Sequence, residues 1–153
     1  MNKTLAYYFE RYIGFIVGIA GAFFAYNSWS KCSFICTSNF FDKLITISTT
    51  LFGFLLTVLT LIVQSTNTVL LNMKKHGSYR RLILYNKNIV LLSAIVCILS
   101  LVLNSTTQKE DIEVSIFLQV VSLINFSLFI WAVVDTFIFV FIFYRLLISE
   151  TET

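Results

Sequence analysis

The sequence predicts an all-α integral membrane protein: one domain over residues 1–153 with four transmembrane helices, extended on the cytoplasmic side. Three observations support this fold class. Hydrophobic residues make up 58% of the chain and charged residues 12%, whereas soluble domains carry about 25% charged residues. The chain contains no Pro. Its apolar residues gather into four long stretches, which have to be helical if they cross lipid, because lipid offers backbone polar groups no partners.

The four stretches give the expected helices in order. About 20 residues cross a hydrocarbon core of about 30 Å. By that measure the stretch 12–29 is just long enough, and 82–103 is slightly longer than needed. The stretches 44–71 and 114–148 exceed the span by several turns, and the absence of Pro lets them continue beyond the bilayer. No polar segment is long enough to form a nucleic-acid-binding module, so we expect no direct nucleic-acid binding.

Basic residues indicate which end faces the cytoplasm. The segment between the second and third stretches, taken together with the beginning of the third, holds five basic residues and no acidic residue: Lys74, Lys75, Arg80, Arg81 and Lys87. Cytoplasmic loops of membrane proteins are enriched in Lys and Arg. The loop after the third stretch instead holds three acidic residues and one basic residue. We therefore expect a bacterial inner-membrane protein with both termini in the cytoplasm.

Counting inward from the outer boundaries places polar residues near the inner membrane surface. Twenty residues end near Gln64 in the second stretch and near Asp135 in the fourth, and Lys87 in the third reaches a similar depth. In a second register the fourth helix is displaced along its axis. It leaves Asp135 near the middle of the bilayer and residues 114–123 at the outer surface. The sequence leaves both registers open.

Small and polar residues recur at helical spacing. Gly14, Gly18 and Gly21 share one face of the first stretch, which lets a second helix approach closely, and we expect them to serve helix packing. The second stretch carries a longer stripe, formed by Thr46, Thr49, Gly53, Thr57, Thr60, Gln64 and Asn67. The stripe has two interpretations, a dry seam between copies of the chain or the lining of a water-filled path. Both place the second helix at an interface rather than facing lipid.

Asp135 is the one acidic residue inside a hydrophobic stretch. Ionisable residues in the membrane are costly and usually have a partner or a function. Lys87 and Arg81 are the candidate partners by depth. We expect a structural salt bridge or a simple interfacial carboxylate, and a gating or proton-linked role is the alternative. Asn125 belongs to the same helix and to its face of small and polar residues.

Cys32 and Cys36 lie in the loop between the first two stretches, on the expected outer side. In an oxidising space the pair can form a disulfide, and free thiols are the alternative. Four-helix thiol-oxidising membrane enzymes also have an external cysteine pair. Here, however, the spacing is Cys-x-x-x-Cys and the third cysteine, Cys97, lies within a stretch, so a thiol-redox enzyme is a minor alternative.

Other chemistry has little support. The single His76 rules out paired-His ligation of haem or a metal. No Gly-rich phosphate loop and no clustered carboxylates occur. We therefore expect no catalytic residues, no metal and no cofactor.

Two features point to a partner at the cytoplasmic end. Lys74, Lys75, Arg80 and Arg81 anchor the topology and attract anionic lipid, by about 1 kcal/mol each, and they also suit docking of an acidic soluble protein. The segment 136–148 is apolar all round apart from Arg145, so in water it would need burial by other subunits or a partner. We expect a non-catalytic homo-oligomeric scaffold or sensor in the lipid bilayer. The alternative is a pore-forming or membrane-permeabilising effector lined by the stripe of the second helix.

Four tightly connected spans, cytoplasmic termini, long inner helices and the segment LFGFLLTVLTLIVQ resemble the small membrane subunits of bacterial antiphage defence systems of the Kiwa type. The resemblance covers the whole chain, is architectural, and transfers no role to any single residue. It implies an oligomeric membrane sensor or effector that works with a cytoplasmic protein when infection perturbs the envelope.

Overall fold

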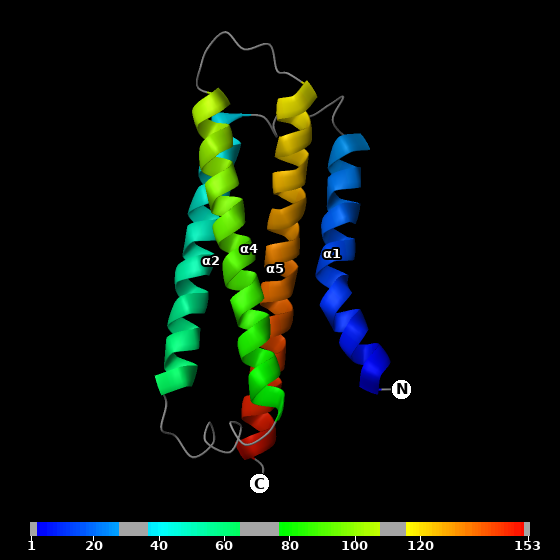
Figure 1. Ribbon diagram of the computed structural model, residues 1–153, viewed down its shortest axis with the longest axis vertical. Coiled ribbons are helices and arrows are strands. Elements are labelled where there is room, and N and C mark those ends of the chain that lie inside the picture. Colours follow the sequence, from blue (N-terminus) through cyan, green and yellow to red (C-terminus); the bar gives the residue numbers. More distant parts are fainter. Residues whose placement is uncertain (1–2, 28–36, 65–76, 108–115, 152–153) are drawn as a thin grey trace.

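The computed structural model describes residues 3–27, 37–64, 77–107 and 116–151, and these residues form four helices (Figure 1). The helices are α1 (Lys3–Asn27), α2 (Ser38–Gln64), α4 (Gly77–Thr107) and α5 (Ile116–Thr151). At 1.5 Å per residue they are about 37, 40, 46 and 54 Å long. The expectation of an all-α chain with four helices is confirmed.

Three of these helices contain segments long and apolar enough to cross a membrane. The segments are Ser38–Gln64, Leu82–Thr107 and Ile116–Arg145. The apolar part of α1, Tyr12–Asn27, is shorter. The composition and these lengths together support a membrane protein with transmembrane helices.

The helix boundaries differ from those expected from hydropathy. α1 already begins at Lys3 and α4 covers Gly77–Thr107, because polar flanking residues continue the helical backbone without a Pro to stop it. α2 starts earlier than expected, where the carbonyl oxygen of Thr37 accepts hydrogen bonds from the backbone of the first turn. Residues 28–29 and 65–71, expected to be helical, lie outside the described residues.

The helices α2, α4 and α5 share a core, and α1 lies against the far side of α5 (Figure 1). Each helix runs antiparallel to the next one in the sequence. Apolar side chains of all three inner helices meet in two clusters, one near each end of the core. The buried members are Leu55, Ile62, Leu82, Ile89 and Phe139 in one cluster, and Phe41, Leu44 and Leu103 in the other.

The buried face of α4 follows a seven-residue repeat. Its apolar positions, Leu82, Ile89, Val96 and Leu103, alternate with the polar positions Asn86, Ser93 and Ser100. Steps of three and four residues are the spacing with which helices pack at a small crossing angle. The buried residues of α2 fit the same repeat. The pairing of α2 with α4 is therefore specified along its whole length.

Two hydrogen bonds show how deeply α5 is inserted relative to its neighbours. Nδ2 of Asn125 donates to Oγ of Ser100 at 2.8 Å, and Tyr85 Oη donates to Oδ1 of Asp135 at 3.3 Å. Both bonds join α4 to α5. They place Asp135 beside the half of α4 that precedes its midpoint.

The expectation that Gln64 and Asp135 lie at one level is wrong. Nδ2 of Asn86, the residue after Tyr85, donates to the carbonyl oxygen of Leu55 at 3.1 Å. Gln64 lies nine positions beyond Leu55 on α2, about 13 Å further toward that end of the bundle. The second register, in which Asp135 lies further than Gln64 from the expected cytoplasmic end, describes the packing better, because side-chain contacts and not loop positions set the relative levels.

Candidate functional site

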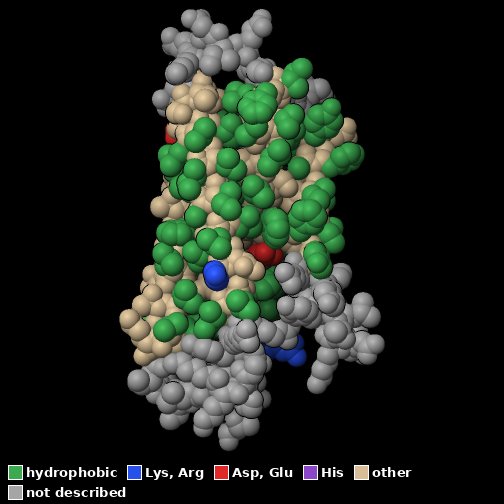
Figure 2. Space-filling model, viewed as in Figure 1, with side chains coloured by type: hydrophobic (Ala, Val, Ile, Leu, Met, Phe, Trp, Pro, Cys, Tyr) green, Lys and Arg blue, Asp and Glu red, His purple; other side chains and the backbone are tan. Residues whose placement is uncertain are grey.

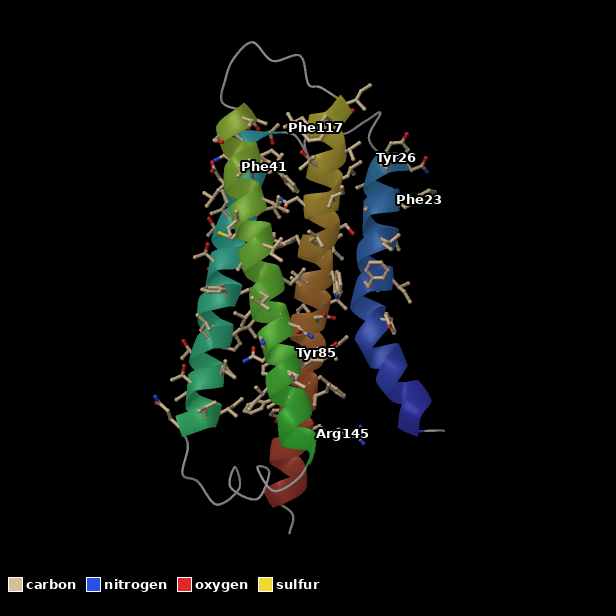
Figure 3. The ribbon with its side chains drawn as sticks, viewed as in Figure 1. Phe23, Tyr26, Phe41, Tyr85, Phe117 and Arg145 are labelled. Atoms are coloured by element: carbon tan, nitrogen blue, oxygen red, sulfur yellow. The ribbon has the colours of Figure 1, made fainter. Side chains whose placement is uncertain are left out.

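Large hydrophobic side chains cover most of the outer surface. Figure 2 shows them over the visible face of the bundle. The exposed set includes Phe23 and Phe24 of α1, Leu61 of α2, Ile98 of α4 and Phe117 of α5. Figure 3 shows Phe23 on the side of α1 that points away from α5. A surface this apolar suits lipid, whereas soluble monomers rarely expose large contiguous apolar patches.

The three glycines of α1 lie against α5. A Cβ atom at Gly18 would come within 2.8 Å of the backbone oxygen of Ser127. At Gly21 it would meet the Cδ1 atom of Ile130, and at Gly14 it would meet the side chains of Trp131 and Asp135. The close approach of the two helices therefore depends on the missing side chains, which is the packing role expected for these glycines.

Asp135 lies where α1, α4 and α5 meet, and it is 8% exposed. Tyr85 of α4 donates its hydroxyl to this carboxyl group. Trp131, one turn earlier on α5, lies next to Asp135, and both side chains face Gly14 of α1. Among the described residues, the buried Nε1 of Trp131 has no acceptor in hydrogen-bonding geometry. The Trp131 ring packs edge-on against Phe15, with 5.2 Å between ring centroids. Aromatic groups and a neutral hydroxyl thus surround the carboxyl group.

The salt bridge expected for Asp135 is not formed with Lys87. Lys87 is exposed, and the hydroxyl of Tyr85 donates to Asp135 instead. Lys87 lies two positions after Tyr85, which is about 200° of helix rotation, so the two side chains point to different sides of α4. The side chain of Arg81, the other expected partner, is outside the described part of the chain.

A second group of polar side chains is buried in the core. Asn86, Ser93 and Ser100 of α4 and Asn125 of α5 are each at most 1% exposed. The two amides donate to Leu55 and Ser100, but the Oδ1 atoms of Asn86 and Asn125 and the Oγ atom of Ser93 have no partner. Buried polar residues in membrane helices hold neighbouring helices together and fix their register.

The stripe of α2 lies on the outside of the bundle, away from the core. Its described members are all exposed: Thr46, Thr49, Gly53, Thr57, Thr60 and Gln64. Thr46, Thr57 and Thr60 each donate to the carbonyl oxygen four residues earlier, at 2.8 to 2.9 Å. The hydroxyl of Thr49 lies 3.4 Å from Sγ of Cys97. A Cβ atom at Gly53 would meet nothing within 4 Å.

No family model, no curated protein and no solved structure matches this chain.

Several expected site residues lie outside the described residues. These are Cys32, Cys36, Asn67, Lys74 and Lys75. Arg80 and Arg81 lie in the first turns of α4, but their side chains are not described. Within the described ranges, no group of three or more His, Cys, Asp or Glu residues could hold a metal ion.

The structure adds three residues that sequence reasoning missed. Tyr85 donates a hydrogen bond to Asp135, and Trp131 lies next to Asp135 opposite Gly14. Asn86 connects α4 to α2 through its hydrogen bond to Leu55. A signal for Asn86 was present, because it precedes Ser93 and Ser100 at the same seven-residue interval. Trp131 lies four residues before Asp135 and hence on the same helix face. Nothing in the sequence distinguishes Tyr85 from the other tyrosines.

Proposed function

We propose that this chain is a non-catalytic membrane scaffold or sensor that works as a homo-oligomer and presents its basic end to a soluble protein. In this proposal all four helices cross a bacterial inner membrane and both termini lie in the cytoplasm. The architectural resemblance to antiphage membrane subunits makes defence against phage the proposed process.

The observation that carries the proposal is the apolar surface of α5 beyond Asp135. Phe137 and Phe141 are 72% and 67% exposed, and Tyr144 is exposed next to Arg145 near the end of the helix (Figure 3). α5 is about 54 Å long, whereas the hydrocarbon core is about 30 Å thick. Any part of this apolar surface that leaves the lipid needs protein to cover it.

Charge at the same end favours an acidic partner. Lys74, Lys75, Arg80 and Arg81 lie between the end of α2 and the second turn of α4, which is the end of the bundle that α5 reaches with Arg145. Positive charge speeds the encounter with an acidic protein surface and helps to orient it. A soluble partner that also covers the α5 aromatic residues would bury apolar surface and pair these charges at once.

The test replaces all four of these basic residues by Gln. Membranes containing the chain are mixed with the soluble protein encoded by the adjacent gene, and the bound fraction is measured. We expect binding at least tenfold weaker than for the unchanged chain. Lys109→Gln, which removes a positive charge from the loop between α4 and α5 at the opposite end, is the matched control and should bind normally. Full binding by the fourfold variant, with topology verified by reporter fusions, contradicts the docking proposal.

The exposed polar stripe of α2 favours a pore as the second candidate. Several copies around an axis could turn these residues toward one central path. The hydroxyls of Thr46, Thr57 and Thr60, however, already donate to carbonyl oxygens of their own helix. Planar bilayers separate the two functions. Currents that change when Gly53 is replaced by Leu support the pore, and the absence of current with and without the soluble partner excludes it.

A further inference from the structure

We propose that two copies of this chain associate through the exposed face of α2, with the two α2 helices parallel and Asp42 of each copy facing Lys43 of the other. The proposal rests on the membrane location proposed above and names the surface that makes the oligomer. This surface, called the α2 face below, consists of Asp42, Thr46, Thr49, Gly53, Thr57, Thr60 and Gln64.

The α2 face is a continuous strip of exposed residues. Its members follow one another at steps of three and four residues from Asp42 to Gln64, which covers about 33 Å of helix. The buried residues of α2 lie on nearly the opposite side of the helix, against α4 and α5. Exposed large side chains flank the strip, with Phe54 and Leu61 on one side and Leu56 and Val63 on the other. The α2 face is therefore a strip of mostly small side chains between two rows of larger ones.

The same chain shows how it uses such a strip. Side chains and backbone of α5 occupy the space next to Gly14, Gly18 and Gly21 of α1. Gly53 also lies on a helix face of small side chains, but in the described structure a Cβ atom at Gly53 would meet nothing within 4 Å. In lipid, helices associate by close van der Waals contact at small residues. Thr49 and Asp42 touch Cys97 and Asn104 of α4, but the middle of the α2 face, at Gly53, is left open by its own protomer.

Its polar groups allow a dry contact. The hydroxyls of Thr46, Thr57 and Thr60 donate to their own helix backbone, so they need no further donor partner when they are buried. Burying these hydroxyls consequently costs less free energy than burying hydroxyls without a partner.

Charge complementarity identifies the occupant as a second copy. Two copies in one membrane share one orientation, so a two-fold axis along the membrane normal brings the same ends of both α2 helices together. Asp42 and Lys43 are exposed side by side at that end, and Oδ1 of Asp42 accepts a hydrogen bond from Nδ2 of Asn104 in its own protomer at 2.7 Å, so Oδ2 is the oxygen that faces the second copy in this proposal. The symmetry then pairs each carboxylate with the ammonium group of the other copy. An open hollow of about 260 Å³, lined by Asp42, Lys43, Thr46 and Ile47, gives the incoming lysine side chain room.

Disulfide crosslinking tests the contact in native membranes. All three native cysteines are replaced by Ser, and a single cysteine is introduced as Gly53→Cys. Oxidation should link most of the chain into dimers, because the two-fold axis brings this position close to its own copy. Leu91→Cys, on an exposed position of α4, is the matched control and should stay monomeric. Equal crosslinking at both positions, or none at position 53, overturns the proposal.

A second variant separates loss of contact from loss of fold. Gly53→Leu adds bulk where the protomer has open space, so each chain should fold normally while the dimer population in lipid falls at least tenfold. Ala20→Leu adds similar bulk on the exposed side of α1 and should leave the dimer intact. An unchanged dimer in Gly53→Leu overturns the proposal.

The charges supply a third readout that a purely steric contact would not give. Lys43→Asp should weaken dimerisation, and the added change Asp42→Lys should restore it. A swap that fails to restore dimerisation overturns the reciprocal pairing.

Binding of the soluble protein is measured on the same variants. If the soluble protein still binds while position 53 shows no crosslink, the proposed α2 contact is wrong and the scaffold function stands. If dimers form normally and the soluble protein does not bind, the scaffold function is wrong and the α2 contact stands.

Discussion

Replacing Gly18 by Ala should weaken the contact between α1 and α5. The new Cβ would lie 2.8 Å from the backbone oxygen of Ser127 and 3.3 Å from Cβ of Trp131. Neither atom can move away by side-chain rotation, so the helices have to separate, and overpacking of this kind costs about 1–3 kcal/mol. Alanine favours a helix over glycine by about 0.5–1 kcal/mol. The net loss of stability should therefore be about 1–2 kcal/mol.

Trp131 provides the assay, because its ring lies in this contact against Phe15. In a Trp29→Phe background, its fluorescence is followed while SDS is titrated into protein held in a mild detergent, and the midpoint should shift to less SDS in Gly18→Ala. Gly21→Ala is the matched control, since its new Cβ meets only the end of a side chain that can rotate. A Gly18→Ala midpoint equal to that of the unchanged chain, or a larger shift in Gly21→Ala, would refute the reasoning.

The same titration checks three further predictions. Tyr85→Phe removes the hydroxyl that donates to Asp135 and should lower the free energy of unfolding by about 1–3 kcal/mol. Asp135→Asn should cost much less stability in the Tyr85→Phe background than in the unchanged chain, and additive losses would mean that the two groups do not interact. Asn125→Ala and Ser100→Ala should show a coupling of about 0.6–2 kcal/mol in a double-mutant cycle, and zero coupling would contradict their hydrogen bond. Thr57→Val keeps the side-chain shape and removes a hydroxyl bonded only to its own helix, so protomer stability should change by less than about 0.5 kcal/mol; a loss above about 1 kcal/mol would reveal another partner.

The sequence predicts the fold class because a hydrophobic excess in a short chain leaves few alternatives to membrane helices. It also predicts the α1 contact surface, since Gly14, Gly18 and Gly21 fall on one face by spacing alone. The helix ends were harder to predict. Residues such as Lys3 continue a helix without being apolar, so hydropathy truncates helices that the backbone extends.

The relative depth of the helices was not predictable from loop positions. It follows from which side chains meet, and the bonds from Asn86 to Leu55 and from Asn125 to Ser100 are contacts between distant parts of the chain. The surroundings of Asp135 show the same limit. Similar depth suggested Lys87 as its partner, but rotation about the helix axis places Tyr85 there instead.

The position of α1 beside α5 has a consequence for biosynthesis. Gly18 packs against Ser127, which is translated 109 residues later, and at about 5–20 residues per second this delay is about 5–20 seconds. During that time the glycine face of the first helix has no α5 to pack against. Arrival of the last helix thus completes the fold, and a ribosome that stops before α5 leaves the first helix without its docking site.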